Sequence, residues 1–234
     1  MDDKRKSMTV VEHLEELRRR LFVCLAAVAV GAVVAYSQAG RVLAWLARPV
    51  GHLVFLSPFE AFTAYLHIAC IGGVVLALPV VGYQVWRYVS PALTVRERRW
   101  LAGGVVASAA LFATGVAVGY FVVIPLGIRF LLGFASETMQ PMLSVGNYVS
   151  TVGWMLLAFG AAFQLPIVLF LLVFFGVVTP HQLAQWRPYA IVALFVIAAA
   201  LTPGPDMLSQ IALAIPMWIL FEVSLWLARR VKRS

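Results

Sequence analysis

Six apolar stretches follow one another along the chain, and most are long enough to cross a bilayer as a helix. A spanning helix needs about 20 mostly apolar residues and satisfies its backbone hydrogen bonds internally. The stretches cover residues 21–37, 59–88, 100–134, 148–178, 188–201 and 207–228. Composition agrees, because 62% of residues are hydrophobic and 12% are charged, against about 45–50% and about 25% in soluble domains. We therefore expect an all-α integral membrane protein with six transmembrane helices, forming a single domain over residues 1–234.

Basic residues are distributed unevenly between the two sides that six spans would define. All but three of the 18 lysines and arginines lie in the N-terminal segment, in the loops after the second and fourth spans, or in the C-terminal tail. The other side holds Arg41, Arg48 and Arg129. By the positive-inside rule the crowded side is cytoplasmic. We therefore expect both termini in the cytoplasm, and we attribute most of the net charge of +8 to topology rather than to nucleic-acid binding.

Helix starts are marked by four capping-box patterns, each a Ser or Thr followed three residues later by Glu or Gln. The patterns begin at Thr9, Ser57, Thr94 and Thr179. The last of them predicts a short helix over residues 180–186, lying at the interface before the fifth span. The sequence thus predicts where these helices begin as well as how many there are.

The spans differ in length. The third and fourth run well past the minimum, so they must tilt, bend at Pro125 or Pro166, or project into the headgroups. The fifth is short, with about 15 residues giving roughly 22 Å of helix. Gly115 and Gly119, four residues apart in the third span, are expected to permit close approach of a neighbouring helix.

The N-terminal residues 1–20 are expected to contain an amphipathic cytoplasmic helix. Its apolar stripe consists of Val10, Val11, Leu14, Leu17 and Leu21. Such a stripe lays the helix along the membrane or against a neighbouring span. Glu15 and Arg19, like Glu16 and Arg20, have the i,i+4 spacing of ordinary helix pairs. Helix pairing therefore accounts for the presence of Glu15 and Glu16 as well as a binding role would. The capping box accounts for Glu97 in the same way.

Nothing in the sequence indicates catalysis. There is no Gly-rich phosphate loop, no Cys/His cluster, and no serine or cysteine obviously paired with a base. We therefore expect no catalytic residue, no metal and no cofactor. Charged residues are also scarce at membrane depth, where ion-coupled transporters usually need them. A small secondary transporter or channel is kept as the alternative function.

Gln164 is the main strongly polar side chain near the middle of a span. Either it forms an interhelical hydrogen bond within the bundle, contributing about 0.6–2 kcal/mol, or it offers a polar socket to a partner helix. The sequence alone leaves both interpretations open.

A series of short motifs runs from His13 to Glu222. In order, they are HLEELRRRL (13–21), YQVW (83–86), SPAL (90–93), ERR (97–99), GYF (119–121), FG (159–160), FQLP (163–166), RPY (187–189), LTP (201–203), AIPM (214–217) and LFE (220–222). Together they resemble the TatC family, the multispanning core of the twin-arginine protein translocase. The resemblance covers most of the chain in the expected order.

This resemblance implies a non-enzymatic receptor and scaffold in a bacterial or archaeal plasma membrane. It would bind twin-arginine signal peptides of folded proteins, recruit TatA-like and TatB-like single-span partners, self-associate in a larger complex and depend on the proton motive force. In the family two glutamates, here Glu16 and Glu97, bind the signal peptide, and Arg18, Tyr88 and Pro91 would shape the same surface. Two guanidinium groups suit two carboxylates that offer charge-assisted bidentate bonds.

The resemblance also implies roles for residues elsewhere in the chain. Partner-helix contacts are assigned to Gln164, Thr202 and Gln210, and structural or loop roles to Pro49, Asp206 and Glu222. The family often carries glutamate where this chain has Gln164. A buried amide can still bond a partner's polar group, but it cannot titrate.

Overall fold

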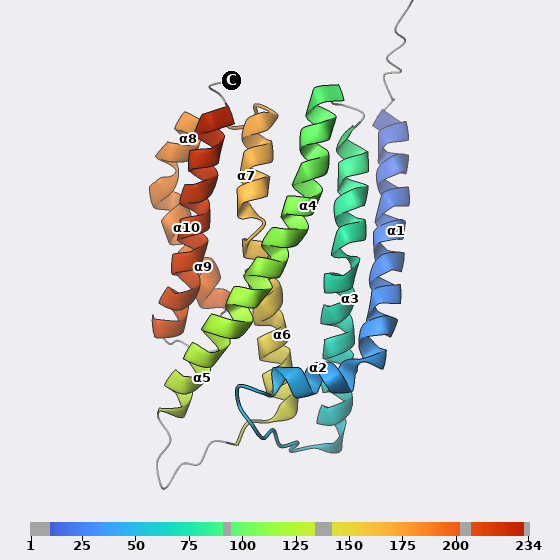
Figure 1. Cartoon of the computed structure of the whole chain (residues 1–234), viewed down its shortest axis with the longest axis vertical. Coiled ribbons are helices and arrows are strands. Elements are labelled where there is room, and N and C mark those ends of the chain that lie inside the picture. Colours follow the sequence, from blue (N-terminus) through green and yellow to red (C-terminus); the bar gives the residue numbers. More distant parts are fainter. Residues whose placement is uncertain (1–9, 91–94, 134–141, 202–206, 232–234) are drawn as a thin grey trace, which may run out of the picture.

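The computed structural model describes residues 10–90, 95–133, 142–201 and 207–231, and throughout these ranges the chain is a bundle of helices (Figure 1). Their bounds are α1 Val10–Ser37, α2 Ala39–Leu46, α3 Pro58–Val89, α4 Val95–Val118, the π-helical segment η2 Gly119–Val123, α5 Ile124–Leu132, α6 Val145–Ala162, α7 Leu165–Phe174, α8 Pro180–Gln185, α9 Arg187–Leu201 and α10 Met207–Val231. The all-α prediction is confirmed, and the predicted short helix after Thr179 is α8.

Apolar helices account for all six predicted stretches. Four helical segments are long and apolar enough to cross a membrane, namely Val11–Ser37, Pro58–Tyr88, Gly103–Phe130 and Val145–Phe174. Two shorter apolar segments, Arg187–Ala199 and Ala214–Trp226, follow them. The chain is therefore a multi-pass membrane protein. The first turn of α1 and the last turn of α10 lie at one end of the bundle, which we call the terminal end; α2 lies across the opposite end, the α2 end (Figure 1).

The N-terminal helix and the first span form one continuous element. Helix α1 continues unbroken from Val10 to Ser37, because good helix formers fill the junction and no Gly or Pro interrupts it. Its apolar stripe is not covered by a neighbouring span in the described part of the chain: Val11 is 73% exposed and Leu14 59%. The stripe was expected to lie either along the membrane or against a neighbouring span. Because no described span covers it, contact with the membrane is the remaining position.

Helices approach each other most closely at glycines. A Cβ at Gly31 of α1 would lie 2.8 Å from the carbonyl oxygen of Gly73 in α3, which leaves no space for any side chain. Likewise, a Cβ at Gly115 of α4 would lie 2.6 Å from the carbonyl oxygen of Phe159 in α6. The packing role predicted for Gly115 is confirmed, whereas the Gly31–Gly73 crossing was not predicted. Helix α6 is the central element, with Phe159 fully buried in the core.

Both long spans are interrupted near their prolines. In the third, hydrogen bonding changes to the π pattern over Gly119–Val123, just before Pro125. Proline has no N–H and clashes with the carbonyl four residues earlier, so a local change in hydrogen bonding relieves both problems. In the fourth, α6 ends at Ala162 and α7 begins at Leu165, so the break falls just before Pro166.

The capping boxes have different outcomes. At Thr179 both reciprocal bonds of the box are present. Ser57 precedes α3 but makes no side-chain cap bond. Instead, the Glu60 carboxylate accepts from the Leu56 N–H at 2.8 Å and from the Ser144 hydroxyl at 2.8 Å, which joins the starts of α3 and α6. The capping box predicted at Ser57 is therefore wrong, and those at Thr9 and Thr94 lie outside the described residues.

Two tyrosines hold the end of α2. The Tyr120 hydroxyl donates to the Trp45 carbonyl and the Tyr148 hydroxyl donates to the Leu46 carbonyl, both at 2.7 Å. The last carbonyls of a helix have no partner within it. The Tyr148 hydroxyl supplies a donor to the Leu46 carbonyl. The Tyr120 hydroxyl adds a second donor to the Trp45 carbonyl, which also accepts from the Arg48 N–H at 3.2 Å. The two tyrosine bonds attach α2, and the turn containing Pro49 that follows it, to η2 and α6.

Candidate functional site

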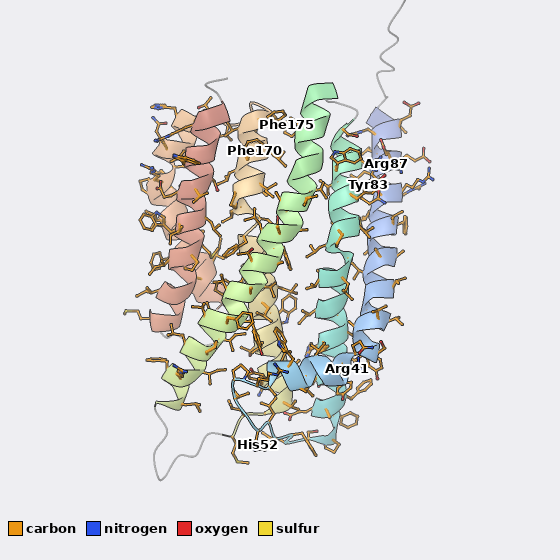
Figure 2. The ribbon with its side chains drawn as sticks, in the orientation of Figure 1. Arg41, His52, Tyr83, Arg87, Phe170 and Phe175 are labelled. Atoms are coloured by element: carbon orange, nitrogen blue, oxygen red, sulfur yellow. The ribbon has the colours of Figure 1, made fainter. Side chains whose placement is uncertain are left out.

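The candidate peptide-binding residues gather at the terminal end of the bundle. Tyr83 and Arg87 of α3 lie at this end beside the first turns of α1, whereas Arg41 and His52 lie at the α2 end (Figure 2). Helix α4 also begins at the terminal end (Figure 1). The start of α1, the last turns of α3 and the start of α4 therefore form one region.

Glu16 is held in a network that joins α1 to α3. Arg20 donates to Glu16 Oε1 through Nε at 3.1 Å and also through Nη2. Its remaining nitrogen, Nη1, donates to Gln84 Oε1 at 3.2 Å. The two charged side chains are mostly buried, at 13% exposure for Arg20 and 22% for Glu16. The i,i+4 pair predicted for these residues is confirmed, and Gln84 is a member that the sequence did not reveal.

The second carboxylate oxygen of Glu16 has no partner among the residues that the structure describes. Oε2 is buried, and within the described part of the chain no hydrogen-bond donor reaches it. A buried polar atom without a partner costs about 1–3 kcal/mol, and more when it carries charge. This oxygen is therefore an acceptor whose donor is not supplied by the described residues.

Glu15, the neighbouring acid, is in a different environment. It pairs with Arg18 at 3.5 Å, and both side chains are 70% exposed. The expected pair of Glu15 with Arg19 is therefore wrong: the i+3 neighbour takes its place. Such an exposed pair contributes about 0.2–1 kcal/mol. Because Glu15 is an exposed glutamate next to Glu16 on the same helix, it provides a matched control for substitutions of Glu16.

An aromatic contact closes the edge of this region. The His13 ring of α1 stacks on the Tyr88 ring of α3, with centroids 4.5 Å apart and planes 20° from parallel. Tyr88 thus lies one turn along α3 from Gln84 and in contact with the first turns of α1. His13 is part of a family motif, but the sequence alone does not predict its contact with Tyr88.

Two of the predicted peptide-binding residues are less fully described. Glu97 is the third residue of α4, at the terminal end, but its side chain lies outside the described part of the structure. Pro91 lies outside the described residues altogether. Their contribution to the site therefore stays a prediction.

The predicted partner-helix residues are bonded within the chain. Gln164 Oε1 accepts from the Ser108 hydroxyl at 2.7 Å, and Gln164 Nε2 donates to the Ser108 carbonyl at 3.0 Å. Gln210 Nε2 donates to the Phe195 carbonyl at 3.0 Å. Each amide thus ties two helices together, which is the intramolecular role considered for Gln164. Thr202 lies outside the described residues.

The remaining assigned residues have structural surroundings. Glu222 of α10 accepts from Arg187 Nη2 at 2.6 Å, which joins α10 to the start of α9. Pro49 lies in the turn after α2, and Asp206 is outside the described residues. Among the residues that the structure describes, no group of three or more His, Cys, Asp or Glu side chains could hold a metal ion.

Comparisons with known proteins agree along the whole chain. The model of the family described as "Sec-independent protein translocase protein (TatC)" matches residues 12–216. The TatC protein of Carboxydothermus hydrogenoformans is 38% identical, with 99% of this chain and 96% of the relative covered. The TatC protein of Escherichia coli is 35% identical over 94% of this chain and 88% of the relative.

A solved structure agrees as well. A crystal structure described as that of the twin-arginine translocase receptor TatC superimposes with a TM-score of 0.84 and 40% identity, covering 94% of this chain and 100% of that one. Sequence and fold therefore lead to the same assignment, and the chain belongs to the TatC family of Sec-independent protein translocase proteins.

Proposed function

We propose that this chain is the receptor that binds twin-arginine signal peptides of folded proteins, and that Glu16 and Glu97 accept the paired arginines. The observation that carries the proposal is Glu16 Oε2, a buried carboxylate oxygen with no donor among the described residues. A guanidinium presents several N–H donors in a planar fork, so one arginine of the peptide can satisfy this oxygen. Family membership removes the transporter or channel alternative.

The surroundings of Glu16 favour arginine over lysine. Because Arg20 already engages Oε1, the guest must approach Oε2 from a fixed direction in a partly desolvated site. Arginine keeps its charge, is more weakly hydrated than an ammonium group and bonds carboxylates with defined geometry. Tyr88, stacked on His13, and the exposed Arg18 border the same surface, with Pro91 following α3. Discrimination between twin-arginine and twin-lysine peptides follows from this chemistry.

The proposed topology has six membrane spans with both termini in the cytoplasm of a bacterial or archaeal cell and one integral domain over residues 1–234. Its support is that the first turn of α1 and the last turn of α10 share one end of the bundle (Figure 1), and that most arginines and lysines lie in the segments at that end. The α2 end, with Arg41, Arg48 and Arg129, would then face outward. The peptide site is on the cytoplasmic side in this arrangement, where unexported proteins are found.

Recruitment of small TatA-like and TatB-like partners is assigned to Gln164, Thr202 and Gln210. Because the amides of Gln164 and Gln210 are already bonded to Ser108 and Phe195, a partner helix would exchange bonds with them rather than fill an empty socket. Each such exchange is close to neutral in energy, which suits reversible recruitment. Pro49, Asp206 and Glu222 are assigned structural or loop roles. The chain self-associates in a larger complex, and export through that complex is driven by the proton motive force.

The test is binding of a labelled twin-arginine signal peptide to the full chain in nanodiscs. Glu16→Gln removes the charge with little change in shape, and we expect about a tenfold or greater loss of affinity, since a charge-assisted bond contributes about 1.5–3 kcal/mol. Glu15→Gln, the matched control on the same helix, should bind like the wild type. A twin-lysine peptide should bind more weakly than the twin-arginine peptide to the wild type. Equal losses for Glu16→Gln and Glu15→Gln, or indifference to lysine, would overturn the proposal.

A further inference from the structure

A cavity of about 390 Å³ lies at the α2 end of the bundle, between the end of α2 and the η2–α5 segment. Its wall includes Trp45, Arg48, Tyr120, Phe121, Ile128 and Arg129. It is far from the proposed peptide site, which is at the terminal end. In the proposed topology the cavity is at the level of the outer leaflet, where aromatic side chains such as Trp and Tyr are favoured.

The cavity concentrates positive charge. Arg48 and Arg129 are two of only three basic residues assigned to this side of the chain, and both line it. Neither has a salt bridge to another described residue, and no carboxylate is in the lining. The third residue, Arg41, lies outside the cavity and donates to Gln38 Oε1 at 3.0 Å. Two arginines from separate elements thus line one site where the described residues supply no counter-charge.

The rest of the wall is mainly aromatic and aliphatic. The Trp45 and Tyr120 rings stack with centroids 3.7 Å apart and planes 14° from parallel. The Tyr120 hydroxyl is already bonded to the Trp45 carbonyl, so the tyrosine presents mainly its ring. Phe121, with 69% of its surface exposed, and Ile128 extend the apolar surface along η2 and α5. A ligand that fits must therefore be amphiphilic, with an anionic group and an apolar body.

We propose that this cavity binds the phosphate of an anionic phospholipid of the outer leaflet, between Arg48 and Arg129, with the first part of an acyl chain against Phe121 and Ile128. Guanidinium groups form charge-assisted, bidentate bonds with phosphate oxygens. A free phosphate ion could use the two arginines but would leave the apolar wall unoccupied. A zwitterionic lipid would bring a cation to a site whose described lining contains no carboxylate. The charge and the wall together select a lipid with net negative charge.

The experiment compares three probes on the purified full chain in a neutral detergent. Phosphatidylglycerol, phosphatidylcholine with the same acyl chains, and inorganic phosphate are titrated separately, with native mass spectrometry counting retained lipids and thermal unfolding measuring stabilisation. Phosphatidylglycerol should be retained about tenfold more strongly than phosphatidylcholine, the ratio that corresponds to one good charged contact. Stabilisation by inorganic phosphate equal to that by phosphatidylglycerol would overturn a lipid site.

Variants locate the binding. Arg48→Gln and Arg129→Gln should each reduce the preference for phosphatidylglycerol, and the double variant should abolish it. Arg41→Gln, which removes the same charge outside the cavity, should retain it. Unchanged stabilisation by phosphatidylcholine shows that a variant is folded. If the double variant does not fold, the lipid preference of the two single variants tests the proposal. Equal loss in Arg41→Gln, or no loss in either cavity variant, would overturn the proposal.

Discussion

Ser108 and Gln164 bind each other twice across the bundle. The Ser108 hydroxyl donates to Gln164 Oε1 at 2.7 Å, while Gln164 Nε2 donates to the Ser108 backbone carbonyl at 3.0 Å. The pair joins α4 to the break between α6 and α7, where the helical ladder is interrupted before Pro166. An amide meets both requirements because it contains a donor and an acceptor. A carboxylate, which only accepts, could not make the second bond.

Gln164→Glu is therefore expected to make stability depend on pH. An ionised glutamate places a second acceptor against the Ser108 carbonyl, whereas the protonated acid can still donate to it. Protonation favours the folded pair, so the variant should be more stable at about pH 5 than at about pH 8, by about 1–2 kcal/mol. Thermal unfolding of the variant in detergent at both pH values measures the effect.

Gln164→Met is the control for that experiment. It removes both bonds without introducing a titratable group, so its loss of stability relative to the wild type should be the same at both pH values. A pH dependence in Gln164→Met as large as in Gln164→Glu would show that another group is responsible.

Arg20 is expected to compete with the signal peptide for Glu16. In the free chain Arg20 donates to Glu16 Oε1 and also to Gln84. The Arg20→Gln variant therefore leaves both carboxylate oxygens of Glu16 available to an arginine of the peptide, and it removes a positive charge that repels that arginine. We expect the variant to bind a twin-arginine peptide about two- to fivefold more tightly, since removing a competing charge contact of up to about 1 kcal/mol changes the affinity by about that factor. Arg19→Gln makes the same change of net charge at an exposed position and should have a smaller effect. Weaker binding by Arg20→Gln would mean that Arg20 orients Glu16 for the peptide instead of competing for it.

The helical elements were predictable because their signals are local. Apolar length marks the spans, Pro125 and Pro166 mark the breaks, and the Thr179 capping box marks the start of α8. Each depends on residues within a few turns of one another. The capping box at Ser57 fails because of a residue distant in sequence. The Ser144 hydroxyl donates to Glu60, the glutamate that the capping box would have used.

The candidate site was predictable only in part, for the same physical reason. The pair of Glu16 with Arg20 follows from helix spacing, but the bond from Arg20 to Gln84 depends on how α1 packs against α3. That packing depends on the Gly31–Gly73 crossing, which has no fixed sequence spacing. The partners of Gln164 and Glu222 were hidden in the same way, because each is on another helix.

Gln210 offers a test of partner recruitment. Gln210→Leu removes the amide that bonds the Phe195 carbonyl and that we assign to the partner helix, so we expect weaker crosslinking of a TatA-like or TatB-like helix to α9 and α10. The expected loss is about threefold to tenfold, the equivalent of one hydrogen bond in the membrane. Site-specific photocrosslinking in membranes measures it, with Gln185→Leu in α8 as the control. Unchanged crosslinking in Gln210→Leu would remove Gln210 from the partner site.

Tyr120 and Tyr148 should differ in how much they stabilise the α2 end, although their bonds to α2 have the same length. Tyr148→Phe removes the donor to the Leu46 carbonyl and should cost about 1–3 kcal/mol, the penalty for leaving a buried acceptor unpaired. Tyr120→Phe should cost less, because the Trp45 carbonyl still accepts from the Arg48 N–H at 3.2 Å and a phenylalanine ring can still stack on Trp45. Thermal unfolding gives the two losses, and hydrogen exchange of the α2 amides shows where they act. Equal losses, or a larger one for Tyr120→Phe, would mean that stacking rather than the carbonyl bond holds α2 and the Pro49 turn in place.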